Sequence, residues 1–232
     1  MNQPFFSGYE VKELQFEVAG LPVRLLRAMN VDELLERLLA KGDTHEDVLD
    51  ERIPYWAELW PSALGLARYL IENKIISPGT TVTELGCGLG LPGIVAGKLG
   101  GDVTLTDYLP EALEFARYNW SLNCEGEPRC VQLDWRQPDP ALAADVLIAS
   151  DITYEKRFFE FLPVAFRAMC KPGGQVIVSD PHRQVAFPFF ENLPALGFEA
   201  VHTAYGIPAW VSTHRHTIDV YAIRPGPAPD RQ

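Results

Sequence analysis

The first 80 residues change their hydrophobic period from two to about 3.6. Apolar and polar side chains alternate between residues 10 and 27 on both sides of a glycine-containing turn, which predicts a β-hairpin. The stretch NVDELLERLLAKG then has helical spacing, with Asn30 as the N-cap, Glu33 three residues further on and Gly42 at the end. Helical spacing returns in residues 61–74, so we expect a second helix there.

From residue 80 onward, short apolar runs alternate with amphipathic segments. The apolar runs predict seven strands, at residues 81–85, 103–106, 130–133, 146–150, 175–179, 200–204 and 217–223. The clearest helices between them cover residues 111–122 and 156–170. This alternation is typical of an α/β fold with an open, largely parallel sheet and helices on both faces. Ligands of such sheets bind beyond the carboxyl ends of the strands.

A glycine-rich loop follows the first of these strands. The sequence ELGCGLG places Gly86, Gly88 and Gly90 at alternate positions. The loop directly follows an apolar run that ends in an acidic residue, Glu84. Glycines in such a strand-to-helix turn let a ligand approach the main chain, because no Cβ stands in the way. The dinucleotide fingerprint G-x-G-x-x-G would need a third glycine where this chain has Leu91. The loop therefore favours a nucleotide-like ligand and disfavours a nicotinamide cofactor.

Acidic residues end the next two strands. Asp107 closes VTLTD, 21 residues after Gly86, where a carboxylate can accept hydrogen bonds from both hydroxyls of a ribose. LDW ends the third strand with an acceptor, Asp134, beside an aromatic face, Trp135. One such feature alone is often a tight turn or a helix cap. Three of them on successive strands indicate a ribose-bearing ligand.

These motifs resemble the class I, seven-stranded methyltransferases that use S-adenosyl-L-methionine. The resemblance rests on ELGCGLG, TDYLPEALEFARYNWSLN, LDW and KPGGQVIVSD and covers residues 80–223. It implies a Rossmann-like sheet of order 3-2-1-4-5-7-6 with strand 7 antiparallel, and S-adenosyl-L-homocysteine as the product formed from the cofactor. The implied cofactor contacts are Trp60, Glu84, Gly86, Cys87, Gly88, Gly90, Asp107, Tyr108, Asp134, Trp135 and Ser150.

Two further stretches resemble the lysine methyltransferases of methyltransferase family 16. These are PYWAELWPSALGLARYL and SDITYEKRFFEFL, the second of which carries the family motif D-x-x-Y as Asp151 and Tyr154. DPHR at residues 180–183 is similar to the branch that includes the methyltransferase of the electron-transfer flavoprotein β-subunit. The resemblance implies that Trp60 lies against the cofactor and that Asp151 and Tyr154 lie at the substrate amine. We therefore expect Asp151 and Tyr154 to be the catalytic pair.

The chemistry of methyl transfer suits these residue types. A lysine with a pKa of about 10.4 must lose its proton before its lone pair can attack the methyl carbon. Asp151 can orient the amine and take the proton directly or through water, while Tyr154 and Trp60 offer aromatic faces to the developing ammonium. A helix cap is the alternative role for Asp151, and core packing is the role expected of Trp56. Local packing is an equal alternative for Tyr108.

Composition and charge limit the remaining classes of protein. The chain has 232 residues, of which 47% are hydrophobic, so one domain with a small extension suffices. We expect residues 1–53 to form an extension of hairpin and helix, residues 54–224 the methyltransferase domain, and residues 225–232 a Pro-rich disordered tail. A net charge of −11 disfavours a nucleic-acid partner. No transmembrane stretch or signal peptide is visible, so we expect a cytoplasmic monomer.

Three smaller features carry expectations of their own. His214 and His216 have no third ligand in the pattern, so no metal site is expected. The four cysteines form no C-x-x-C pair and are expected to be reduced. Between residues 32 and 51 there are eight acidic and two basic side chains, which form either a solvated surface or an acidic rim that steers a lysine-rich protein to the site.

The sequence thus predicts an S-adenosyl-L-methionine-dependent methyltransferase that modifies lysine side chains of a protein substrate. A methyltransferase of a small-molecule amine is the alternative within enzymes, because the same loop and fold serve both. A cofactor-binding protein without catalysis is the alternative outside enzymes, and the presence of Asp151 and Tyr154 counts against it.

Overall fold

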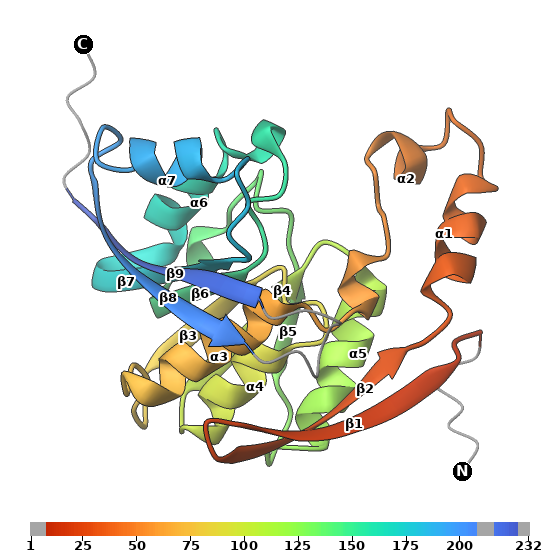
Figure 1. Ribbon diagram of the computed structural model, residues 1–232, viewed down its shortest axis with the longest axis horizontal. Coiled ribbons are helices and arrows are strands. Elements are labelled where there is room, and N and C mark those ends of the chain that lie inside the picture. The colour runs from red at the N-terminus through yellow and green to blue at the C-terminus, as the bar shows by residue number, and fades with distance from the viewer. Residues whose placement is uncertain (1–7, 208–215, 227–232) are drawn as a thin grey trace.

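The computed structural model describes residues 8–207 and 216–226, and its centre is a single mixed β-sheet (Figure 1). Within these residues the sheet has seven strands in the order β5-β4-β3-β6-β7-β9-β8. The strands are β3 (Thr81–Leu85), β4 (Asp102–Asp107), β5 (Arg129–Gln132), β6 (Ala144–Ser150), β7 (Cys170–Asp180), β8 (Phe198–Ile207) and β9 (His216–Pro225). The first five are mutually parallel, whereas β9 is antiparallel to both β7 and β8. The predicted order 3-2-1-4-5-7-6 with an antiparallel seventh strand is confirmed.

A separate two-stranded hairpin precedes this sheet. β1 (Val11–Val18) pairs antiparallel with β2 (Leu21–Ala28) through a two-residue turn. Ala19 and Gly20 have φ values of 47° and 82°, and a type I′ turn requires positive φ at both positions. The hairpin therefore has the right-handed twist that lets one of its faces pack against the rest of the chain.

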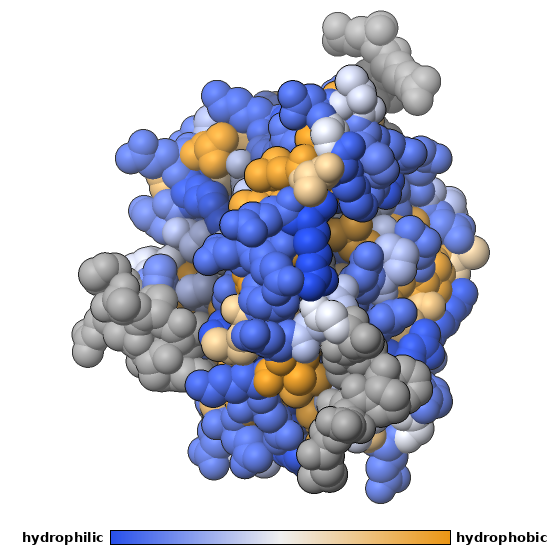
Figure 2. Space-filling model, turned by 90° about the vertical axis from the view of Figure 1, so that its right-hand side faces the viewer, coloured by the Kyte–Doolittle hydropathy of each residue, from blue (hydrophilic) through white to orange (hydrophobic). Residues whose placement is uncertain are grey.

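The segment from residue 30 to residue 60, which we call the arm, connects the hairpin to the sheet domain. It contains α1 (Val31–Leu39), α2 (Glu46–Leu49) and the 3₁₀ turn η2 (Tyr55–Ala57). Viewed from the side of the arm and hairpin, the surface is largely hydrophilic and broken by separate apolar patches (Figure 2). Leu39 and Leu49 are exposed hydrophobic residues of the arm.

The capping interaction expected at α1 differs in the structure. Asn30 occupies the N-cap position, but its side chain makes no hydrogen bond to a helix N–H. Its Oδ1 instead accepts from the N–H of Glu10 at 3.1 Å, and its Nδ2 donates to Glu33 at 2.8 Å. The expected capping box is therefore wrong in detail, because the hairpin supplies a backbone donor that competes for the same oxygen.

The helix expected over residues 156–170 is divided into two. A 3₁₀ turn, η4 (Lys156–Phe158), is followed by α6 (Leu162–Met169), and β7 already begins at Cys170. Pro163 lies in the first turn of α6 and has no N–H to donate, so an uninterrupted helix through this point would lose a hydrogen bond and meet the ring. The apolar stripe that suggested one helix is shared between the two pieces.

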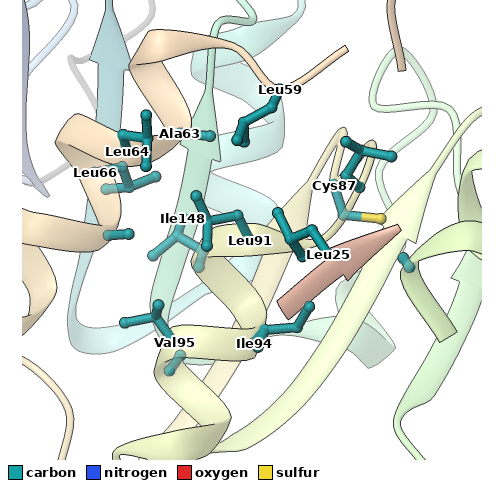
Figure 3. Packing of buried hydrophobic residues seen from close by; sticks show 14 of the residues in the cluster. Leu25, Leu59, Ala63, Leu64, Leu66, Cys87, Leu91, Ile94, Val95 and Ile148 are labelled. Atoms are coloured by element: carbon teal, nitrogen blue, oxygen red, sulfur yellow. The ribbon is translucent and has the colours of Figure 1, made fainter. Parts of the chain in front are cut away.

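Two apolar cores lie on opposite faces of the sheet. Neighbouring residues of β6 point to opposite faces of the sheet. Ile148 therefore belongs to the core under α3, α4 and α5, whereas Leu147 belongs to the core under α6 and α7. Figure 3 shows Ile148, Leu91 and Ile94 packed near Leu25 of the hairpin. These helices are α3 (Pro61–Glu72), α4 (Leu91–Lys98), α5 (Pro110–Ser121), α6 and α7 (Phe187–Asn192).

No helix in the described ranges is both long enough and apolar enough to cross a membrane. β9 extends to Pro225, and residues 227–232 of the expected tail lie outside the described residues.

Candidate active site

A cavity of about 560 Å³ lies beyond the carboxyl ends of the parallel strands and is bordered by the arm. It contains eleven of the thirteen residues that the sequence assigned to the site: Trp60, Gly86, Cys87, Gly88, Asp107, Tyr108, Asp134, Trp135, Ser150, Asp151 and Tyr154. The other two, Glu84 and Gly90, do not line it. The structure therefore brings together residues that are up to 94 positions apart, although their individual roles stay predictions.

The glycine loop forms one wall of the cavity. Gly86, Gly88 and Gly90 have φ values of 62°, 50° and 82°. Residues other than glycine rarely adopt this left-handed backbone conformation. A Cβ on Gly86 would lie 2.9 Å from the ring of Trp135. Gly90 instead faces Ala116 of α5 at 3.2 Å, so it allows close packing of the helices rather than close approach of a ligand.

Glu84 lies behind the loop and is fully buried. Its Oε2 accepts a hydrogen bond from the N–H of Gly93 at 2.9 Å, which ties β3 to the first turn of α4. Burial raises the pKa of this carboxyl well above its usual range. Glu84 therefore positions the loop from behind instead of contacting the cavity.

Asp107 connects the glycine loop to the end of β4. Its Oδ2 accepts from the N–H of Gly88 at 2.9 Å, and its Oδ1 accepts from the N–H of Leu109 at 3.0 Å. The side chain is buried, and this burial raises its pKa. Each oxygen keeps a lone pair for a further donor, so the carboxylate can still accept hydrogen bonds from a ribose diol.

Trp135 supplies an aromatic surface with a free donor. Its ring meets Phe158 edge to face at 5.6 Å, and its Nε1 is buried without a hydrogen-bond partner among the described residues. An indole nitrogen only donates, so a buried one calls for an acceptor from a ligand or water. Bare glycine backbone, a buried carboxylate and this indole together fit the adenosyl group of S-adenosyl-L-methionine.

The arm is joined to this side of the cavity by a set of polar contacts that we call the Asp50 network. Arg136 donates through Nε to both oxygens of Asp134 at 2.9 and 2.8 Å, and through its two terminal nitrogens to Asp50 at 2.8 and 3.1 Å. The hydroxyl of Tyr108 donates to Asp50 and accepts from Arg52 at 2.6 Å. The bond from Arg136 is the main cause that lowers the pKa of Asp50 to about 2.

The Asp50 network changes two expectations drawn from the sequence. Asp134 is already bound by a guanidinium, and Tyr108 packs locally between the guanidinium groups of Arg52 and Arg136, 4.7 and 5.5 Å from its ring centre. Nothing in the local pattern pointed to Arg136, because its partner Asp50 is 86 residues away.

Asp151 lines the same cavity and directly follows β6, the strand next to β3. Its φ of 62° is unusual for an aspartate, and its N–H donates to the carbonyl of Ser179 at 2.8 Å. The carboxylate accepts from the hydroxyl of Ser62 at 3.0 Å and forms an ion pair with Arg183. It caps no helix, since η4 begins five residues later without a side-chain cap, so the helix-cap alternative is wrong.

Several aromatic rings that line the cavity contact one another. Tyr154 meets Tyr55 at 5.9 Å and Phe158 at 5.7 Å, both edge to face, and Tyr55 in turn meets Trp60 at 6.0 Å. Burial raises the pKa of the Tyr154 phenol, which therefore stays neutral and can donate a hydrogen bond. Trp56 packs against Phe115 at 5.0 Å, which confirms its role in the core.

The sequence model of the lysine methyltransferase family matches residues 49–195, which include every cavity residue from Asp50 to Arg183. The chain belongs to this family. The resemblance read from the motifs is therefore confirmed, while the finer similarity of DPHR to the flavoprotein branch stays a prediction.

Three relatives of this lysine methyltransferase family member have names that state an activity. It is 34% identical over 148 residues to EEF1A lysine methyltransferase 3 of Mus musculus. The match covers 61% of this chain and 63% of the mouse protein. It is 37% identical over 129 residues to protein-lysine methyltransferase METTL21E of Bos taurus, with shares of 50% and 44%. It is 34% identical over 125 residues to histone-arginine methyltransferase METTL23 of Rattus norvegicus, with shares of 49% and 56%. The chain thus spans 44 to 63% of the length of these relatives.

Solved structures support the fold of this family member. Magnesium protoporphyrin IX methyltransferase of Synechocystis PCC 6803, with bound S-adenosylmethionine, has a TM-score of 0.56 at 17% identity and covers 84% of this chain and 91% of that one. A TehB-like methyltransferase of Corynebacterium glutamicum has a TM-score of 0.53 at 18% identity, with shares of 83% and 95%. At these identities the likeness concerns the fold alone.

None of the histidines in the described ranges lines the cavity. No group of three or more potential metal ligands occurs in the described ranges. His214 lies outside them, and His216 is the first residue of β9, away from the cavity lining.

Proposed function

We propose that this chain transfers a methyl group from S-adenosyl-L-methionine to the ε-amino group of a lysine in a protein substrate. The observation that carries the proposal is that one cavity is lined both by Asp151 and Tyr154 and by Gly86, Asp107 and Trp135. The family match and the two relatives named as lysine methyltransferases support it.

The glycine loop, Asp107 and Trp135 would hold the cofactor. S-adenosyl-L-methionine supplies an electrophilic methyl group on a sulfonium and is released as S-adenosyl-L-homocysteine. The main chain at Gly86 and Gly88 would contact it closely, and Asp107 would accept hydrogen bonds from the ribose. Trp135 would face the adenine, where its Nε1–H can find the acceptor that the protein does not provide.

Asp151 and the aromatic residues around Tyr154 would prepare the acceptor. Asp151 accepts a hydrogen bond from the amine and so directs its lone pair, and the proton leaves to Asp151 or through water before transfer. Tyr154, Tyr55 and Trp60 exclude water from this part of the cavity, and their ring faces would favour the ammonium that forms on the methylated nitrogen. The strained φ of Asp151 is consistent with a residue held in place for function.

The proposal extends to the setting of the enzyme. Residues 1–53 would be an extension and residues 54–224 the catalytic domain. The four cysteines form no disulfide, which suits a cytoplasmic protein, and the net charge of −11 disfavours nucleic acid and anionic membrane surfaces. We propose a monomer, which light scattering at micromolar concentration tests directly.

Label transfer tests the activity. The protein is incubated with methyl-labelled S-adenosyl-L-methionine and a cell extract, and macromolecules are separated from small molecules before counting. We expect label in a protease-sensitive band, reduced by on the order of 100-fold in Asp151→Asn and unchanged in Asp102→Asn, a matched substitution of an exposed residue at the start of β4. Label only among small molecules would favour the small-amine alternative, and cofactor binding without label would favour the non-catalytic one.

A further inference from the structure

Arg183 lies beside Asp151 in the same cavity, although the two residues follow different strands. Its guanidinium pairs with Oδ1 of Asp151 and lies 3.6 Å from Oδ2 of Asp180, the last residue of β7. The side chain of Arg183 is 27% exposed, and that of Asp151 only 9%. A lysine amine that reaches Asp151 therefore approaches a carboxylate that already has a cation on one oxygen.

The loop that carries Arg183 is firmly held. Asp180 accepts from the N–H of Arg183 at 2.6 Å and from the hydroxyl of Thr153 at 2.7 Å. His182 adopts a φ of 60°, and its Nδ1 lies 2.7 Å from Oδ2 of the buried Asp219. The backbone at Arg183 is thus fixed by contacts outside the cavity, and its guanidinium lies near the two carboxylates of Asp151 and Asp180. These contacts argue against a side chain that simply fills space.

The other ionisable groups around this part of the cavity have partners of their own. Glu58 pairs with Arg27 at 2.8 Å, and Arg157 pairs with Glu51 at 2.9 Å and with Glu155. Tyr154 stays neutral, and burial raises the pKa of Asp180. Asp151 and Arg183 are consequently the charged pair that decides whether the protonated or the neutral form of an amine is favoured beside Asp151.

We propose that Arg183 is a positioning residue that keeps the acceptor amine neutral. The inference rests on the proposed function. An unpaired Asp151 would bind a lysine ammonium as a salt bridge and so hold it in the protonated form, which has no lone pair to give. The guanidinium, which also lies near Asp180, weakens that attraction and places a like charge near the amine, which lowers the pKa of the bound lysine. Asp151 can then act as a hydrogen-bond acceptor that directs the lone pair.

The test compares wild type with Arg183→Gln and Arg183→Lys on the protein acceptor that wild type labels in the extract. The maximal rate at saturating acceptor, kcat, is measured from pH 6 to pH 10, since its pH dependence reports groups in the bound complex. For Arg183→Gln we expect the acid limb of kcat to move up by about one pH unit, with about tenfold lower kcat at pH 7 and a lower KM, because the ammonium now binds better.

Two comparisons separate charge from structure. Arg183→Lys keeps a cation and should leave the limb near its wild-type position, and Arg24→Gln, a matched change on the exposed hairpin, should behave as wild type. A limb that stays in place while kcat of Arg183→Gln falls equally at every pH, or a raised KM, would overturn the inference and leave the proposed function intact. Wild type that labels no protein would overturn both.

Discussion

Single residues at the carboxyl ends of the strands decide what the cavity can bind. Gly86 is the strictest of them, because it combines a positive φ with a ring 2.9 Å from the place of a Cβ. Asp107 uses two of its lone pairs to hold the glycine loop and keeps the others for a ligand. These residues link the local backbone geometry directly to the binding of a nucleoside.

Gly86→Ala tests this link. The methyl group must move Trp135 or the loop, so we expect affinity for S-adenosyl-L-homocysteine to fall at least about tenfold, with a loss of about 1–2 kcal/mol in unfolding free energy from the backbone conformation. Titration calorimetry measures the first quantity and urea unfolding the second. Gly20→Ala is the matched control, since Gly20 also has a positive φ but nothing lies within 4 Å of its Cβ. Equal cofactor affinity in both variants would refute the role of Gly86.

At the residue scale, sequence spacing located most of the cavity. Residues that follow a strand, such as Asp107 and Asp151, could be found because the carboxyl ends of parallel strands meet at one edge of the sheet. Asp50 and Arg136 could not be found, because they pair across 86 residues. Arg183 stands in the DPHR motif, but its pairing with Asp151, 32 residues away, could not be read from that motif. Local patterns carry no record of such distant pairs.

At the scale of elements, the hairpin and the sheet domain are joined through α5. Asn119 of this helix is fully buried, and its side chain bonds to the N–H and the carbonyl of Leu26 at 2.6 and 3.0 Å and to the carbonyl of Leu89 at 3.0 Å. One side-chain amide therefore bonds backbone groups of both β2 and the glycine loop.

Asn119→Ala should remove this connection. It leaves buried backbone groups of Leu26 and Leu89 without partners, so we expect a loss of roughly 3 kcal/mol in unfolding free energy. Asn123→Ala provides the comparison, because Asn123 makes similar bonds to Arg24 at the exposed surface, where water can replace it, and should cost under about 1 kcal/mol. Both losses are measured by urea unfolding. Similar losses in the two variants would show that burial of the amide does not increase its contribution to stability.

Elements were largely predictable and their ends were not. All seven strands of the sheet were anticipated, because a period of two and short apolar runs depend on the burial of each strand. The division at Pro163 and the position of the Asn30 side chain were missed. Both depend on which hydrogen bond the backbone can make in competition with a neighbour, and periodicity does not encode that choice.

At the scale of the whole molecule, the arm is attached to the domain by charge. Of the eight acidic residues from 32 to 51, five form ion pairs with arginine or lysine: Glu33, Glu46, Asp47, Asp50 and Glu51. Much of the field that an acidic rim would need is thus neutralised locally. We expect the arm to act through the Asp50 network, which borders the cavity, more than through long-range attraction.

The Asp50 network gives stability a defined pH dependence. The pKa of Asp50 is lowered from 3.8 to about 2, so its contribution is present above pH 4 and is lost as the pH falls toward 2. We expect Asp50→Asn to cost about 1 kcal/mol in unfolding free energy at pH 6 and progressively less toward pH 3, measured by urea unfolding. Asp43→Asn, at an exposed arm residue without an ion pair in the described ranges, should cost little throughout. A constant difference for Asp50→Asn would contradict the assignment.

The identity of the methylated residue tests the central claim most directly. The protein that wild type labels in an extract is hydrolysed, and its labelled amino acids are separated by chromatography against methyllysine and methylarginine standards. We predict that the label is in ε-N-methyllysine and is lost with Asp151→Asn. Label in methylarginine, the modification suggested by the name of the relative METTL23, would contradict the lysine assignment while leaving the methyltransferase fold in place.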